Sequence, residues 1–246
     1  MVTIKANYLQ SFREIMEFIN IIHSEISAIN LTFKLSLITC IFLFFFGTPI
    51  AYYLAFKKSK YSPLLESLVT MPLVLPPTVI GFYLIVFFNP ETILGKIFIT
   101  ITGNQLAFSF NGLVFASIIY SLPFWVQPLQ NSFQSVDKKV LEAASNMGAS
   151  KLDLFNKVIF PLCKKGFLTS FVLSFAHTVG EFGIVLMVGG NIEKETRVLS
   201  ISIYDHVEQL SYSNANSLSL ILIIFSFITL LFLYYLNNKL TFGLKI

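Results

Sequence analysis

Glu181 has the most unusual position of any ionisable side chain, because it lies inside a long apolar stretch of the sequence. An ionised carboxylate is costly in hydrocarbon, so Glu181 should face a bundle interior, a water-filled cavity or a polar partner. His177, one helical turn earlier, is the nearest candidate partner. Ala176 and Gly180, four positions apart, would let another helix approach closely. In the alternative interpretation, Glu181 ends the helix near the outer interface, and Gly180 and Gly183 serve only tight packing.

The other residues that could do chemistry form no catalytic, metal-binding or nucleotide-binding pattern. The three histidines and two cysteines are widely separated: His23, His177, His206, Cys40 and Cys163. The sequence contains neither a G-x-S-x-G nor an H-E-x-x-H motif. The only Gly-Lys pair, Gly95 and Lys96, has Pro90 and Ile97 where a Walker A loop needs Gly and Ser or Thr. We therefore expect no catalytic residue, cofactor or metal ion, and any ATP must be hydrolysed by another chain.

The composition indicates a protein that is solvated mainly by lipid. Of 246 residues, 55% are hydrophobic, 27 are phenylalanine and only 12% are charged. An ordinary soluble domain has about 25% charged residues. The formal net charge is +4, but the basic residues lie between apolar blocks and form no stripe, so nucleic acid is not an expected partner.

Five apolar stretches are long enough to cross a bilayer core of about 30 Å, which needs roughly 20 residues of helix. They run approximately over residues 35–56, 68–88, 106–129, 166–189 and 218–236. The connectors are too short for a second domain of usual size. The sequence therefore predicts an all-α integral membrane protein with about five transmembrane helices.

The basic residues predict the orientation, because positively charged loops tend to stay in the cytoplasm. Most lie after the first stretch, in the connector at about 130–165 or in the C-terminal tail: Lys57, Lys58, Lys60, Lys138, Lys139, Lys151, Lys157, Lys164, Lys165, Lys239 and Lys245. The opposite side holds fewer: Lys5, Arg13, Lys96, Lys194 and Arg197. We expect a multi-pass protein of the plasma or inner membrane, with its N-terminus outside and its C-terminus in the cytoplasm.

Residues 1–30 have a different pattern from the rest of the chain. Apolar residues recur there at steps of three and four, while Arg13, Glu14, Glu17 and Glu25 interrupt any continuous apolar run. We predict an amphipathic helix that lies at the membrane interface. A tilted sixth span is the alternative, and a signal peptide fits poorly because acidic residues fall where its apolar region should be.

Three prolines, Pro72, Pro76 and Pro77, fall within the second apolar stretch. Each removes a backbone N–H and clashes with the carbonyl one turn back, so the helix should kink or begin late. Freed backbone groups at membrane depth are tolerated only against protein or a water-filled cavity, which makes this stretch a candidate lining for a permeation path. Alternatively, Pro72 opens the helix and the other two bend it for packing.

The connector at about 130–165 predicts two short cytoplasmic helices. Asp137 is a plausible N-cap for the first, and Gly148 suits its C′ position. Ser150 and Asp153 form a capping-box-like start for the second helix, which should stop before Pro161. Such a short projecting helix suits insertion into a cleft on another protein, although it could also be an inert loop.

The same connector resembles the signature of ABC-importer permeases. Glu142, Ala143, Ala144 and Gly148, followed after nine residues by the Val-Ile-Phe-Pro run at 158–161, match the EAA pattern of that family, with apolar replacements at Val158 and Phe160. The segments MPLVLPPTVIGFYLIV and GEFGIVLMVGGNIEKETRVLSISIY are similar to those of molybdate permease subunits. The resemblance covers residues from about 30 to the last span.

This resemblance implies a type I ABC importer transmembrane domain over residues 31–240. The segment from Glu142 to Gly148, with Ala143 and Ala144, would be the coupling helix that docks on a cytoplasmic ABC ATPase dimer. A second copy of the chain would complete the path, and an extracytoplasmic oxyanion-binding protein would deliver molybdate or, alternatively, tungstate or sulfate. Candidate residues for the path or gate are Pro76, Pro77, Gly180, Glu181, Phe182 and Gly183.

An ion-coupled secondary transporter is the alternative from a different class. Such a protein would show internal repeats or several intramembrane ionisable residues. Glu181 is the only acidic residue well inside a predicted span, and no clear repeat is present. We therefore favour a subunit in which ATPase closure pushes on the coupling helix and rocks the bundle between inward-open and outward-open forms.

Overall fold

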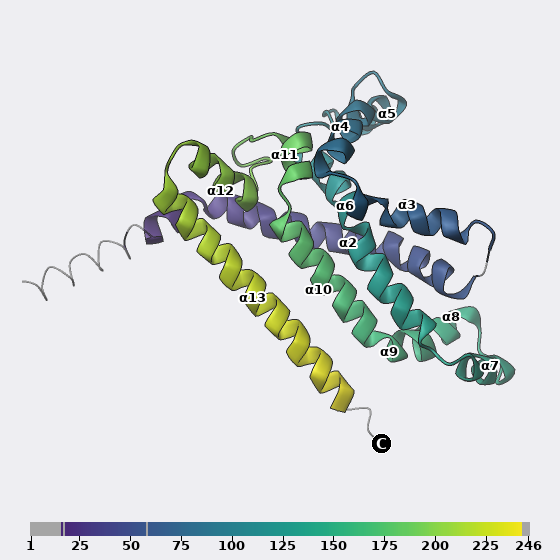
Figure 1. The fold of residues 1–246 in the computed structure, drawn as a ribbon. Helices are drawn as coiled ribbons and strands as arrows, with labels where there is room; N and C mark the ends of the chain where they lie inside the picture. Colours follow the sequence, from purple (N-terminus) through teal and green to yellow (C-terminus); the bar gives the residue numbers. More distant parts are fainter. Residues whose placement is uncertain (1–15, 17, 58, 243–246) are drawn as a thin grey trace, which may run out of the picture.

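The computed structural model describes residues 16, 18–57 and 59–242, and these form helices joined by loops without any strand (Figure 1). Three helices are long and apolar enough to cross a membrane: α2 (Ile26–Phe56), α6 (Phe110–Gln134) and α13 (Tyr212–Phe242). The prediction of an all-α membrane protein is confirmed.

Two further spans are bent pairs of helices. The first joins α3 (Ser62–Val74) to α4 (Pro77–Phe88) at an angle of 113°. In the second, the helical segment 151–162 meets α10 (Lys164–Gly180) at 72°. The segment 151–162 carries Lys151, Asp153 and Lys157, so α10 is the part of this pair that suits the membrane. If each bent pair counts as one span, the described residues contain up to five spans, in agreement with the sequence.

The remaining helices are short. They are α5 (Ile93–Thr102), α7 (Lys138–Asn146), α8 (Lys151–Asp153), the π-helix η1 (Leu154–Ile159), α9 (Phe160–Leu162), α11 (Gly183–Gly189) and α12 (Leu199–Glu208). Figure 1 shows α11 and α12 toward one end of the bundle, while α7 and the C-terminal end of α13 lie toward the other.

Two predicted boundaries are wrong. The first span begins at Ile26 and not near Leu35, and residues 18–24 are helical before a single turn residue, Glu25. The predicted span 166–189 is not one helix, because it is interrupted between Gly180 and Gly183. Most of the predicted amphipathic segment, residues 1–15 and 17, lies outside the described residues, as do Lys58 and Lys245.

Helices α2, α6 and α10 pack together to form the centre of the bundle. One apolar core lies among α2, α4, α6 and α11, and it includes Leu35, Leu84, Leu113 and Ile184. A second core lies toward the α7 end and contains the fully buried ring of Trp125. These two cores hold the broken segments and the connector at about 130–165 against the bundle.

Candidate functional site

The break between α3 and α4 occurs at Leu75 and Pro76, both of which have an extended backbone with ψ near 139°. A residue that precedes proline is pushed out of the helical region, and Pro76 and Pro77 impose this on Leu75 and Pro76 in turn. Pro77 then begins α4, where its missing N–H costs nothing. The predicted kink is confirmed. Pro72 lies buried inside α3, so the interpretation in which it opens the helix is wrong.

The second break separates α10 from α11 at Glu181 and Phe182. Glu181 has an extended backbone with ψ of 131°. Its Oε1 accepts a hydrogen bond from the Ile184 backbone N–H at 3.2 Å, and Ser200 Oγ donates to the Glu181 carbonyl oxygen at 2.5 Å. Backbone groups near the interruption are therefore bonded within protein, as membrane depth requires.

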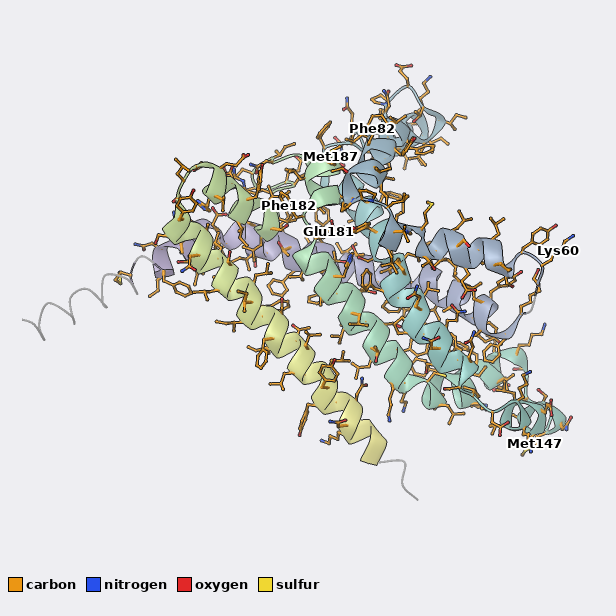
Figure 2. The ribbon with its side chains drawn as sticks, in the orientation of Figure 1. Lys60, Phe82, Met147, Glu181, Phe182 and Met187 are labelled. Atoms are coloured by element: carbon orange, nitrogen blue, oxygen red, sulfur yellow. The ribbon has the colours of Figure 1, made fainter. Side chains whose placement is uncertain are left out.

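The two breaks meet, because α4 packs against α11. A Cβ built on Gly183 would lie 2.7 Å from Pro77 Cβ, and one built on Gly81 would lie 2.6 Å from Met187 Cβ. Figure 2 shows Met187 and Phe82 on these neighbouring helices, with Glu181 and Phe182 at the start of the α11 segment. The structure thus brings together Pro77 and Gly183, two of the residues predicted from the sequence as candidates for the path or gate.

Gly180 does not take part in this close packing. A Cβ built on it would have no atom within 4 Å, so the expected close helix approach does not occur at Gly180 within this chain. Gly183 and Gly81 provide the close approach instead. A small residue in the sequence permits a close helix contact, but the sequence does not tell which helix makes that contact.

The Glu181 side chain is buried, with 7% of the residue exposed, and its neighbour is His177 as expected. His177 Nε2 lies 3.8 Å from Glu181 Oε2, and His177 Nδ1 lies 2.9 Å from Ser121 Oγ. The imidazole ring stacks on Phe124 with centroids 3.9 Å apart. The alternative interpretation is partly correct, since α10 does end at Gly180, but the carboxylate is held in a polar cluster.

Sequence reasoning missed the hydroxyl groups of this cluster. Thr178 Oγ1 lies 2.9 Å from Ser121 Oγ, which joins α10 to α6. The sequence does contain a periodic pattern, because Ser170, Ser174 and Thr178 recur at every fourth position of α10. Such a stripe of hydroxyls on one face of an apolar helix could have identified the packing face.

The first of the two helices predicted in the connector, α7, has both predicted ends. Asp137 Oδ1 accepts from the Lys139 backbone N–H at 2.9 Å, which makes it the N-cap. Gly148 has φ of 82°, its N–H donates to the Ser145 carbonyl, and the next N–H, of Ala149, donates to the Ala144 carbonyl. These two bonds form a Schellman motif, in which glycine avoids the strain of a left-handed backbone.

No residue of α7 is buried, and Glu142 and Ala143 are exposed. Met147, at the end of this helix, is 89% exposed and lies on the same side of the molecule as Lys60 (Figure 2). A short helix that is capped at both ends and exposed along its length therefore projects from the bundle. A helix of this kind is what the family resemblance implies for this segment.

The second helix predicted in the connector begins as expected but does not end as expected. Ser150 Oγ accepts from the Asp153 backbone N–H at 3.1 Å, and Asp153 also bonds Lys157 at 2.6 Å. The bond with the Lys157 ammonium group, together with those from Ser150, lowers the pKa of Asp153 from 3.8 to about 2. The helix then passes through the π-helix η1 and includes Pro161, so the prediction that it stops before Pro161 is wrong. Pro161 is tolerated because it lies in the first turn of α9.

Residues 47–242 match the family model described as "Binding-protein-dependent transport system inner membrane component". The chain belongs to this family. It is also 46% identical over 210 residues to "Molybdenum transport system permease protein ModB" of Azotobacter vinelandii, which covers 85% of this chain and 93% of that protein. The predicted ABC importer permease is therefore confirmed.

More distant relatives of this permease share its fold. A "Probable sulfate transport system permease protein cysT" of Helicosporidium sp. subsp. Simulium jonesii is 30% identical over 87% of this chain and 78% of that protein. A chain from "Crystal structure of bacterial alginate ABC transporter in complex with alginate pentasaccharide-bound periplasmic protein" superposes with a TM-score of 0.70. That match covers 98% of this chain and 92% of the other at 16% identity, so it supports the type I transmembrane fold alone.

Within the described residues, no group of three or more His, Cys, Asp or Glu side chains could hold a metal ion. At the break between α10 and α11, the ionisable side chains that come together are His177, which bonds the Ser121 hydroxyl, and Glu181, which bonds the Ile184 backbone N–H. The site is therefore built from backbone breaks, small residues and aromatic rings.

Proposed function

We propose that this permease forms half of the membrane path of an ABC importer for an oxyanion, with molybdate as the first choice. The supporting observation is the 46% identity with the molybdenum permease over most of both chains. Sulfate is the second candidate because sulfate permeases are more distant relatives, and tungstate is a third because it resembles molybdate in shape and charge.

We propose that the gate lies where α4 meets α11. Pro76, Pro77 and Gly183 bring two interrupted helices together, and Phe182 packs its ring against Tyr204 with centroids 4.9 Å apart. Broken helices pack less continuously than whole ones, so relative motion of α4 and α11 needs few hydrogen bonds to change. Gly180 belongs to this proposal as the last helical residue before the break.

Glu181 would not repel a passing anion under this proposal. Its carboxylate accepts a backbone hydrogen bond from Ile184 and lies beside His177, so it acts as a structural cap of the broken helix. The anion would then pass hydroxyl groups and backbone N–H donors. Weak contacts of this kind suit a conduit, and selectivity would belong mainly to the binding protein.

The segment from Glu142 to Gly148 is the proposed coupling helix. Its exposure and its two firm caps support docking in a groove of a separate cytoplasmic ATPase, which would hydrolyse the ATP. Two ATPase subunits are expected, one for each permease copy. The extracytoplasmic binding protein would meet the opposite end of the bundle, near α11 and α12 (Figure 1).

A second copy of the chain is the proposed partner of the uncovered apolar side of α3 and α4. Val74 is 81% exposed, and Phe82 and Tyr83 are more than half exposed. A surface groove of about 630 Å³ also runs along α3 and is lined by Leu64, Leu68 and Met71 among others. Large adjoining apolar surfaces of this kind mark protein or lipid contacts.

The orientation is also proposed, with the α7 end in the cytoplasm and the N-terminus outside. Lys57 and Lys60 follow the end of α2, and Lys138 and Lys139 lie in α7. These groups lie toward one end of the bundle, as positively charged cytoplasmic loops should.

Uptake of radiolabelled molybdate into proteoliposomes tests the proposed function. The chain would be reconstituted with its ATPase and binding protein, with ATP supplied on the α7 side. We expect uptake that needs ATP and both partners, and competition by tungstate that is stronger than competition by sulfate. Uptake by this chain alone, driven by an ion gradient, would support the secondary transporter instead.

A further inference from the structure

A groove of about 530 Å³ lies between the C-terminal end of α2 and the helical segment that begins with α8. Its lining residues come from both elements: Thr48, Pro49, Tyr52, Tyr53, Phe56, Lys57, Lys151, Leu152 and Phe155. Most of these side chains are apolar or aromatic. Both charged residues among them are lysines, so the groove combines an apolar wall with a positive end.

The dimensions of the groove match one leaflet of a bilayer. Its lining on α2 extends from Thr48 to Lys57, and at 1.5 Å per residue this corresponds to about 14 Å along the helix. Half of a bilayer core is about 15 Å thick. Lys57 therefore lies at headgroup level when Thr48 lies near the level of the acyl chain ends.

The two lysines keep their positive charge available. Lys57 Nζ lies 5.2 Å from the centroid of the Tyr53 ring, and no ion pair joins Lys57 or Lys151 to a carboxylate in the described part of the chain. The acidic residue nearest to Lys151 in the sequence, Asp153, already bonds Lys157 and Ser150, and the one nearest to Lys57, Glu66, accepts from Gln130. An anionic group in the groove would therefore find two cations that no described carboxylate neutralises.

We propose that this groove binds an anionic glycerophospholipid of the cytoplasmic leaflet, with its phosphate between Lys57 and Lys151 and an acyl chain along Tyr52 and Thr48. The proposal rests on the orientation given under the proposed function. Free phosphate does not explain the apolar wall, and a water-soluble ATPase cannot follow α2 to the depth of Thr48.

The lipid would add a contact between two parts of the chain that already pack together, since the rings of Tyr52 and Phe155 have centroids 6.0 Å apart. One wall of the groove belongs to the bundle helix α2, and the other to the segment from Lys151 to Phe155. That segment follows α7 directly after Gly148. A bound lipid would reinforce this packing and so strengthen the attachment of the proposed coupling helix to the bundle.

Native mass spectrometry of the assembled transporter, with its ATPase bound, tests the proposal. Complexes purified from nanodiscs of phosphatidylglycerol or phosphatidylcholine would be compared for retained lipid. Each lysine near a membrane surface contributes about 1 kcal/mol toward an anionic lipid, so the Lys57→Gln, Lys151→Gln double variant should retain phosphatidylglycerol about 30-fold more weakly. The matched control is Lys60→Gln, because Lys60 is an exposed lysine near the groove that does not line it.

A Lys57→Arg, Lys151→Arg variant keeps the charge and should restore retention. Equal retention by the glutamine double variant and the control, or equal retention of the two lipids, would overturn the proposal. Displacement of the lipid by millimolar inorganic phosphate would assign a simple anion site instead. Crosslinking to the ATPase from Tyr52→Cys, which lines the groove on α2, would assign the groove to that partner. Because retention is measured without transport, a failure of molybdate uptake would contradict the proposed function and leave this test intact.

Discussion

The Pro77 ring lies so close to Gly183 that a Cβ on Gly183 would stand 2.7 Å from Pro77 Cβ. This contact joins two helix interruptions that are more than a hundred residues apart in the sequence. One interruption comes from two adjacent prolines, and the other contains a buried glutamate. The permease therefore has a position in the membrane where neither neighbouring segment is a continuous helix.

Replacing Gly183 by alanine should push α4 and α11 apart. The added methyl group has no room against the rigid Pro77 ring, and overpacking of this kind costs about 1–3 kcal/mol. We expect a lower thermal unfolding temperature in detergent and slower molybdate uptake. Gly180→Ala is the matched control, because a Cβ there meets no atom within 4 Å. Equal unfolding temperatures for the two variants would contradict the close contact.

Replacements of Gly148 should distinguish two effects: strain at the end of α7 and obstruction of the proposed ATPase docking surface. Gly148→Ala must hold a left-handed backbone at a cost of about 1 kcal/mol, whereas Gly148→Asn tolerates that backbone better. A Cβ at this position meets nothing within 4 Å, so a side chain can leave the backbone here without an immediate clash, and Gly148→Trp adds bulk on the exposed side of the turn. We expect the tryptophan variant to lose far more ATP-driven uptake than the alanine variant.

The measurement for Gly148 is uptake together with ATP hydrolysis in the same proteoliposomes. A loss of uptake with hydrolysis retained would identify uncoupling at the docking surface. Normal transport by Gly148→Trp with an intact ATPase complex would show that the segment from Glu142 to Gly148 does not dock there.

Features determined by neighbouring residues were predictable from the sequence. Two adjacent prolines push the residue before them out of the helical conformation, as at Leu75. A glycine with a left-handed backbone ends an amphipathic helix, as Gly148 ends α7. The N-caps at Asp137 and Ser150 were predictable for the same reason, since each side chain bonds a backbone N–H two or three residues later.

Features determined by distant partners were not predictable in this way. The interruption at Glu181 depends on Ser200, and the polar cluster needs Ser121 on another helix. Glycine spacing gave Gly180 as a packing position, whereas the actual contacts of Gly183 and Gly81 follow from where α4 lies. A single sequence records small residues and hydroxyls but not which helices face them.

Glu181 should tolerate glutamine better than leucine. Glutamine keeps an oxygen that can accept from the Ile184 N–H, so Glu181→Gln should retain the start of α11 and near-normal uptake. Glu181→Leu leaves that buried donor without its partner, which costs about 1–3 kcal/mol. Thermal unfolding and uptake of both variants check this prediction. If Glu181→Gln were as damaging as Glu181→Leu, the negative charge itself would be needed in the path.

The stability of the start of α8 should depend on pH only under acidic conditions. Bonds with Lys157 and Ser150 lower the pKa of Asp153 from 3.8 to about 2, so the folded loop favours the ionised carboxylate. The stabilisation is therefore fully present above the unfolded pKa, near 4, and is lost as the pH falls through about 2.

After correction for intrinsic exchange rates, amide hydrogen exchange of residues 151–157 should be the same at pH 6 and pH 8. Asp153→Asn should raise it at both pH values, because asparagine removes the charge that Lys157 pairs with, while Lys139→Gln, in α7, should not. Unchanged exchange in Asp153→Asn would mean that the Ser150 cap alone holds this helix start.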